Sequence, residues 1–321
     1  MGNEQNKTIT VISKEWLNIK RISIKYSSYV KYKNIIETHI IPYFENISVN
    51  KIDEMSIANF IFNLEKEKKL SSSQLHSIKN VLKSIYVYGE KKYHFHHIDF
   101  QYVKISSHKM NCQVLSDDQE YVLTKYCMNT IDTTSLAILL GLYAGLRIGE
   151  VCALKWIDID INERIIKVSK TIQRLKNDKE NQSKTRLIIS KPKTNSSTRY
   201  VVIPQILLEY IKKYQSIFHI NDQNIFIVTQ STKLPDPRNI QRRFIKVCRK
   251  CQFETNFHIL RHTYATNCIK YGVDVKTLSE MLGHANISTT LNRYVHPSLE
   301  FKKVEIDKLN KSSIVADYLN L

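Results

Sequence analysis

Residues 257–296 read FHILRHTYATNCIKYGVDVKTLSEMLGHANISTTLNRYVH and predict a run of short helices. Gly272 and Gly283 stand where two of these helices would end, because glycine readily adopts the left-handed backbone found at helix C-termini. Ser288 stands where the next helix would begin, since a serine side chain can accept a hydrogen bond from a free N–H of the first turn. We expect this part of the chain to be helical throughout.

Upstream of this stretch the pattern alternates between helical and extended segments. A capping-box pattern, SDDQ at 116–119, predicts a helix start, and an apolar helix at 136–143 runs into GLRIGE at 145–150. Short apolar and β-branched runs predict strands at 165–172, 186–190 and 200–203. The polar segment RLKNDKENQSK at 174–184 predicts an exposed loop. The expected fold class is mainly α with a small antiparallel sheet (α+β).

The N-terminal third is expected to form a separate helical domain. Ile57, Phe60, Ile61 and Leu64 recur at helical spacing, whereas the periodicity fades in KISSHKMN at 104–111. The expected boundaries are 1–12 for a short N-terminal extension, 13–105 for the helical domain, 106–113 for a linker, 114–297 for a second domain and 298–321 for a helical tail.

The C-terminal tail is expected to dock on a neighbouring subunit. Phe301, Val304 and Leu309 give it an apolar face at roughly helical spacing, and such a stripe is seldom left exposed to water. Docking of the tail on its own domain stays open as the alternative.

Composition excludes several classes of protein. The 321 residues carry 48 Lys and Arg against 30 Asp and Glu, a net charge of +18, and 17 of the basic and 10 of the acidic residues fall within 1–110. The sequence contains no run of about 18 apolar residues, so it predicts no membrane span. Its six scattered cysteines are typical of reduced thiols in the cytoplasm. A protein positive along its whole length fits duplex DNA as a partner. A solubilising surface charge, or lysine enrichment from an AT-rich genome, would give the same balance.

Six residues could together carry out nucleophilic attack on a phosphodiester. They are Arg147, Lys193, His258, Arg261, His284 and Tyr294. Taken singly each has an ordinary explanation, such as an Arg147–Glu150 ion pair or a surface position for Lys193 in KPKTNSSTR at 191–199. Arginine, however, offers a planar fork of donors for phosphate oxygens, tyrosine can act as an activated nucleophile, and lysine or histidine can move protons.

Five features of the sequence together resemble the tyrosine recombinase (phage integrase) family: GLRIGE, the lysine between two strands, HILRHT, LGHANISTT and the closing RY. The resemblance spans about 114–296 as a catalytic domain, and 13–104 looks like that family's helical, SAM-like core-binding domain. It implies that Arg147 and Arg261 clamp the phosphate, with Glu150 beside Arg147 fixing its guanidinium.

The resemblance assigns the remaining roles as well. His258 and His284 would hydrogen-bond the phosphate and move protons, Lys193 would be the general acid toward the 5′ oxygen, and Tyr294 would form a 3′-phosphotyrosine. About a dozen residues precede the core-binding segment, where many integrases carry a separate arm-site DNA-binding domain, so the resemblance does not extend to binding of distant arm sites.

The resemblance implies a site-specific recombinase of the cytoplasm that needs neither cofactor, metal nor ATP. It would act as a homotetramer on two DNA duplexes, with an accessory DNA-bending or directionality protein as a further partner to consider, and no membrane. The long polar loop at 174–184 favours integration and excision of a phage or mobile element. The alternatives are a chromosome-dimer resolvase, a type IB topoisomerase-like enzyme and a non-catalytic DNA-binding protein.

One motif also resembles a zinc site. Cys248, Cys251, His258 and His262 are spaced C-x2-C-x6-H-x3-H, whereas a zinc finger places about a dozen residues between its pairs. The two cysteines also continue the apolar stripe of Phe244. We therefore expect packing here and no metal.

Overall fold

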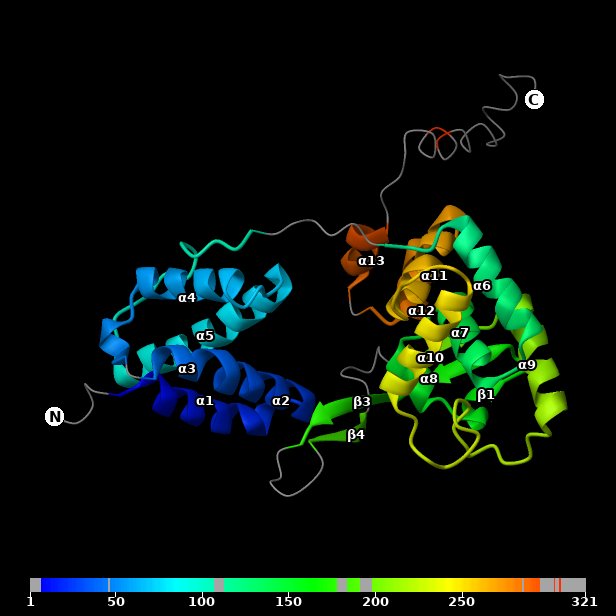
Figure 1. Cartoon of the computed structure of the whole chain (residues 1–321), viewed down its shortest axis with the longest axis horizontal. Coiled ribbons are helices and arrows are strands. Elements are labelled where there is room, and N and C mark those ends of the chain that lie inside the picture. Colours follow the sequence, from blue (N-terminus) through cyan, green and yellow to red (C-terminus); the bar gives the residue numbers. More distant parts are fainter. Residues whose placement is uncertain are drawn as a thin grey trace, which may run out of the picture. The chain divides into compact units, whose positions relative to one another are not determined.

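The computed structural model describes residues 7–45, 47–106, 113–177, 184–190, 198–284 and 286–294, together with Lys303 and Ile306. Its chain divides into two compact units (Figure 1). The N-terminal unit comprises Met1–Met110 and Leu175–Lys184, and the C-terminal unit comprises Asn111–Arg174 and Thr185–Leu321. Most of the expected linker and tail lies outside the described residues. Within the described part, no helix combines the length and apolar character needed to cross a membrane.

The N-terminal unit is a bundle of helices around an apolar core. Its elements are α1 (Ile9–Ser23), α2 (Tyr26–Ile35), the π-helix η1 (Ile36–Ile40), α3 (Ile41–Phe44), the short 3-10 helix η2 (Val49–Lys51), α4 (Glu54–Lys66) and α5 (Ser72–Tyr93). The first helix starts before residue 13, the expected domain boundary, because Ile9 and Ile12 are buried in this core. The aromatic rings of Phe44 and Phe60 pack 5.0 Å apart at its centre.

The C-terminal unit is built around one buried helix. Its helices are α6 (Asp117–Asn129), α7 (Thr133–Ala144), α8 (Ile148–Ala153), the 3-10 helix η3 (Trp156–Asp158), α9 (Gln205–Phe218), α10 (Pro237–Lys250), α11 (His258–Lys270), α12 (Val275–Leu282) and α13 (Ile287–Tyr294). Since α7 is apolar on nearly all sides, it is covered all round, by α6, α8, α9, α10 and α11. The mainly helical fold with a small antiparallel sheet is confirmed.

In the described part of the chain, two small sheets accompany these helices. β1 (Ile159–Asp160), β2 (Ile165–Val168) and β5 (Arg199–Val202) pair antiparallel in the order β1-β2-β5, with Ile166 opposite Val201. β3 (Thr171–Lys176) and β4 (Thr185–Ser190) form the second sheet.

Two strand boundaries differ from those expected from sequence. The run expected at 165–172 is divided between β2 and β3, which belong to different sheets. Arg174, expected in a loop, lies within β3, because its guanidinium binds Thr185 of the paired strand and Asp236.

Candidate active site

Arg147 and Glu150 form the first part of the site, at the start of α8. Gly145 ends α7 with a φ of +63°, and this turn brings Arg147 to the N-terminus of the next helix. The guanidinium Nη1 of Arg147 donates to Oε1 of Glu150 at 2.8 Å, and its backbone N–H donates to Oε2 at 2.9 Å. The Arg147 side chain is 41% exposed while that of Glu150 is 8% exposed, so the arginine still faces solvent.

Arg199 is a second arginine on the same carboxylate, and sequence reasoning missed it. Its Nη1 donates to Oε1 of Glu150 at 3.0 Å and its Nη2 to Oε2 at 2.9 Å. Arg199 lies on the face of β5 that also carries the buried Val201, and it is itself 6% exposed. The alternation in RYVV, with Val201 inward, was the signal that could have placed Arg199 inward as well.

Glu150 is held as an anion by this environment. Burial raises the pKa of Glu150, but the hydrogen bonds and charge of Arg199, and the charges of Arg147 and Arg261, lower it to about 2. The carboxylate therefore stays ionised across the physiological range.

Arg261 joins three segments that are distant in sequence. It is 2% exposed, and its Nη1 donates to the carbonyl of Gly145 at 2.7 Å while its Nη2 donates to that of Leu282 at 2.6 Å. The same Nη2 lies 3.2 Å from Nε2 of His284, whose Nδ1 lies 2.8 Å from Oγ1 of Thr290. A guanidinium with fixed partners on several sides is a rigid, preorganised charge.

The remaining expected residues contribute differently. His258 begins α11 with an exposed side chain, its ring 4.4 Å from that of His262, whereas Arg261 one turn later is buried. Lys193 lies outside the described residues, between β4 and β5. Tyr294 is the last residue of α13, one turn after Thr290, and its side chain is not among those described. The structure thus brings together Arg147, Glu150, Arg261 and His284.

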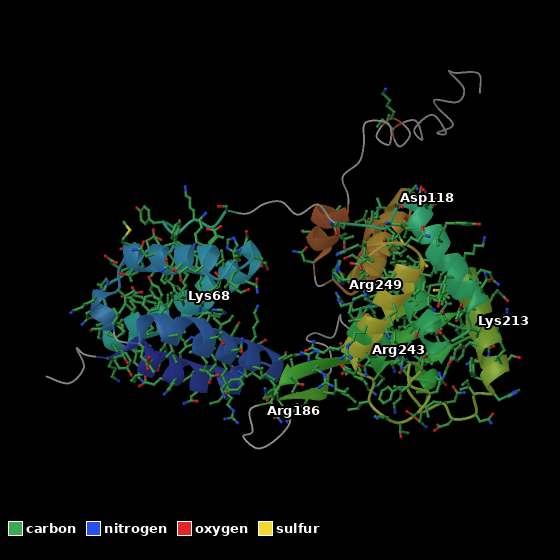
Figure 2. All side chains as sticks on the ribbon, viewed as in Figure 1. Lys68, Asp118, Arg186, Lys213, Arg243 and Arg249 are labelled. Carbon is green, nitrogen blue, oxygen red and sulfur yellow. The ribbon has the colours of Figure 1, made fainter. Side chains whose placement is uncertain are left out.

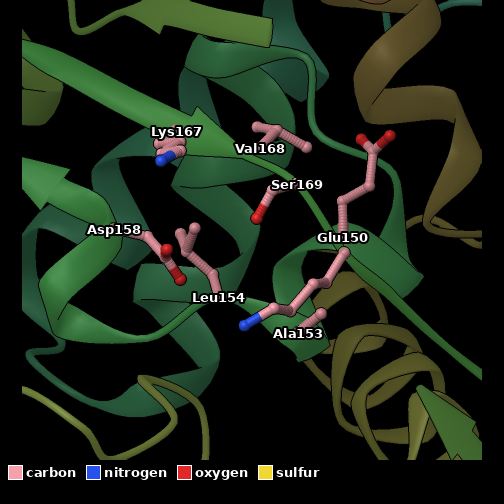
Figure 3. Close-up of a pocket in the computed structure, with 8 residues that line it drawn as sticks. Glu150, Ala153, Leu154, Asp158, Lys167, Val168 and Ser169 are labelled. Atoms are coloured by element: carbon pink, nitrogen blue, oxygen red, sulfur yellow. The ribbon is translucent and has the colours of Figure 1, made fainter. Parts of the chain in front are cut away.

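A shallow hollow lies beside Glu150 (Figure 3). Lys167 and Asp158 line it, together with Ser169, Lys170 and the apolar side chains of Ala153, Leu154 and Val168. Among the described residues no group of three or more His, Cys, Asp and Glu is placed to hold a metal ion. Cys248 is fully buried beside Phe244 in the apolar core, and burial raises the pKa of its thiol to about 12.

The helix α10 presents an exposed basic surface. Its basic residues, all exposed, are Arg238, Arg242, Arg243, Lys246, Arg249 and Lys250, and its sequence PRNIQRRFIKVCRK contains no acid (Figure 2). The opposite face buries Ile240, Phe244 and Val247, which fixes the helix on the core. Arg249 pairs with Glu254 at 2.8 Å. Such a one-signed surface suits a polyanion.

Comparison with known proteins gives two family matches. Residues 113–300 match the model described as the phage integrase family, and residues 8–64 match the phage integrase N-terminal SAM-like domain. A tyrosine recombinase XerC-like protein of Caldanaerobacter subterraneus subsp. tengcongensis is 28% identical over 332 residues, covering 95% of this chain and 83% of the relative. The ICEBs1 integrase of Bacillus subtilis is 27% identical over 314 residues, covering 90% of this chain and 79% of the relative.

Solved structures share the fold. The Tn1549 transposon integrase in complex with transposon right end DNA gives a TM-score of 0.78 at 20% identity, covering 94% of this chain and 99% of that one. A lambda integrase tetramer bound to a Holliday junction gives a TM-score of 0.67 at 16% identity, covering 93% of this chain and 82% of that one.

Proposed function

The chain belongs to the phage integrase family of tyrosine recombinases, and from this premise we propose that it integrates and excises a mobile element. Members of this family are DNA strand-transferring enzymes that act site-specifically. The relatives named above include the integrase of a mobile element, and the Tn1549 transposon integrase shares the fold. A chromosome-dimer resolvase is the alternative within the family, since the first relative is XerC-like.

One observation carries the assignment of the site. The buried Arg261 of HILRHT is fixed by Gly145 of GLRIGE and by Leu282 and His284 of LGHANISTT, so the contact brings three sequence motifs together. Arg147, held by Glu150, adds a second and more exposed guanidinium. We propose that these two arginines bind the non-bridging oxygens of the scissile phosphate, where negative charge builds up during attack.

The proposed reaction conserves the energy of the phosphodiester. The Tyr294 oxygen forms a bond to phosphorus as the bond to the 5′ oxygen breaks, leaving a 3′-phosphotyrosine and a free 5′ hydroxyl. The tyrosine proton passes to a base, for which His258 and His284 are the candidates, and Lys193 protonates the leaving 5′ oxygen. Attack by a 5′ hydroxyl of the partner strand reverses these steps, so no ATP is consumed and no cofactor is required.

The proposed partner is duplex DNA, and the proposed assembly is a homotetramer on two duplexes. The basic face of α10 would supply phosphate contacts, while the helical segment at 13–105 would act as a core-binding domain. We also propose that the enzyme works in the cytoplasm, that 106–113 is the linker between the domains, and that the tail at 298–321 docks on a neighbouring subunit. An accessory DNA-bending or directionality protein fits the same scheme.

The experiment uses a nicked duplex built from the repeats that flank the coding region. Because loss of the strand below the nick traps the intermediate, the protein should accumulate as a covalent adduct visible by denaturing electrophoresis. Tyr294→Phe loses only one hydroxyl and should bind the same duplex without forming the adduct. An adduct formed by Tyr294→Phe would show that another residue is the nucleophile, and strand exchange between two duplexes separates recombination from simple relaxation.

A further inference from the structure

Glu150 is saturated by hydrogen bonds from two arginines. Each carboxylate oxygen accepts two: Oε1 from Arg147 Nη1 and Arg199 Nη1, and Oε2 from the Arg147 backbone and Arg199 Nη2. The third donor nitrogen of Arg199, Nε, donates to the carbonyl of Met281 at the end of α12. Arg199 is therefore engaged on every side within the protein.

The two arginines differ in access to the phosphate. The Arg199 side chain is 5% exposed, whereas that of Arg147 is 41% exposed. A guanidinium that is enclosed and whose nitrogens all donate to protein oxygens is not placed to bind DNA directly. Its effect on the reaction must pass through the groups it binds.

The charge balance indicates what that effect is. An Arg147–Glu150 pair alone has no net charge, so the carboxylate would weaken the attraction of Arg147 for a phosphate. A second guanidinium on the same carboxylate leaves the trio with a net charge of +1. Because Glu150 and Arg199 are buried, their charges act on Arg147 more strongly than they would in water.

We propose that Arg199 is a positioning residue that neutralises Glu150, so that Arg147 keeps both its orientation and its positive charge for the scissile phosphate. This inference rests on the proposed function, and it deepens it by adding a residue to the phosphate clamp.

Arg199 also connects the segments that carry the other candidate residues. It is the first residue of β5, directly after the segment at 191–198 that holds Lys193, and Met281 precedes His284 by one short turn. In this turn Gly283 has a φ of +66°, and a Cβ added there would lie 3.0 Å from Cδ of Arg199. The arginine is thus packed tightly against the turn that leads to His284.

The charged groups around Glu150 define how it should titrate. Arg147, Arg199 and Arg261 lower its pKa, and Lys167 and Asp158 line the hollow beside it, together with Lys170. Replacing Arg199 with glutamine removes two hydrogen bonds and a charge while burial remains. The pKa of Glu150 should therefore rise, and acidification should neutralise the carboxylate that Arg199 no longer balances.

The test is a double-mutant cycle in the full chain, with Arg199→Gln, Glu150→Gln and the double variant. For each variant the single-turnover rate of adduct formation on the nicked duplex is measured from about pH 5.5 to about pH 8.5. Each rate is divided by the wild-type rate at the same pH, so that titrations common to the variant and the wild type cancel. Binding of the same duplex and thermal unfolding are measured in parallel.

Arg199→Gln should lower adduct formation about a hundredfold at the alkaline end, and this ratio should recover as the pH falls. When Arg199→Gln is added to Glu150→Gln, the rate of adduct formation should fall by less than about threefold, since no carboxylate is left to neutralise. Neither Glu150→Gln nor the double variant contains an unpaired buried carboxylate. The comparison of these two proteins therefore applies even where Arg199→Gln alone does not fold.

A large loss on both backgrounds, or a ratio independent of pH, would mean that Arg199 acts only in packing and would overturn the inference. Failure of the proposed function is distinct from this, because wild-type protein would then bind the duplex and form no adduct at any pH.

Discussion

The Nη2 of Arg261 lies 3.2 Å from Nε2 of His284, and this contact assigns the tautomer of the histidine. A guanidinium can only donate, so Nε2 accepts and the ring proton sits on Nδ1. Nδ1 then donates to Oγ1 of Thr290, 2.8 Å away and fully buried in α13. His284 thus lies between an arginine and a hydroxyl, and these two contacts fix its ring plane at both nitrogens.

Thr290→Val should reduce cleavage without weakening DNA binding. Valine has nearly the shape of threonine but cannot accept the hydrogen bond from Nδ1, so the imidazole loses one of its two supports. We expect adduct formation on the nicked duplex to fall about tenfold, the equivalent of one buried hydrogen bond. Thr290→Ser keeps the hydroxyl and should stay close to wild type. Equal losses in the two variants would show that the methyl group, not the hydroxyl, matters here.

Gly145→Ala should destabilise the C-terminal unit strongly. Gly145 has a φ of +63°, and a Cβ added there would lie 2.5 Å from the ring of Tyr264. The backbone strain and the clash together should lower the free energy of unfolding by about 3 kcal/mol, measured by urea denaturation.

Gly272→Ala is the matched control for this change. Gly272 also has a positive φ, +80°, but a Cβ there would meet nothing within 4 Å. Only the backbone cost remains, about 1 kcal/mol. Similar losses in the two variants would contradict the packing of Tyr264 against this turn.

Arg242→Gln and Arg243→Gln should each make DNA binding less sensitive to salt. Both are exposed on α10, and each phosphate contact that is lost should reduce the slope of log K against log salt by about 0.9. Lys213→Gln, on the exposed side of α9, changes the net charge equally and should leave the slope unchanged (Figure 2). An equal change of slope in the α9 variant would mean that overall charge, rather than α10, binds the DNA.

Local signals in the sequence predicted several helix ends, but Ser288 is not the expected N-cap, because it lies inside α13 and its N–H donates to Oδ1 of Asn286. Ser116 and Gln119 form the expected capping box, with reciprocal hydrogen bonds of 3.1 and 3.2 Å, and Gly283 ends α12 in the left-handed conformation. These features depend on residues three or four positions apart, so a short stretch of sequence is enough to predict them.

Long-range pairs could not be predicted in the same way. Glu150 of α8 and Arg199 of β5 are 49 positions apart, and their contact depends on the tertiary packing of the two elements, which short-range sequence patterns do not contain. Similarly, the division of the run at 165–172 between two sheets depends on partners that are distant in sequence. The Arg147–Glu150 pair, by contrast, spans a single turn and was visible from the spacing.

Lys193→Ala should lose cleavage of a normal DNA strand and recover it when the leaving group is changed. If Lys193 protonates the 5′ oxygen, its loss should slow adduct formation by roughly a hundredfold or more, because an alkoxide is a poor leaving group. Sulfur in place of the 5′ bridging oxygen leaves as a thiolate, which is stable near neutral pH since thiols ionise at about pH 8.5. On that substrate the variant should approach the wild-type rate.

Arg147→Ala and Arg261→Ala are the controls, since the substitution of sulfur does not change the charge that builds up on the non-bridging oxygens. The buried Arg261 is a fixed charge and the more exposed Arg147 is held by Glu150, so both variants should remain defective on the sulfur substrate. Rescue confined to Lys193→Ala separates proton donation from charge stabilisation within one assay. Rescue of all three variants, or of none, would remove Lys193 as the proton donor and leave His258 or His284 to protonate the 5′ oxygen.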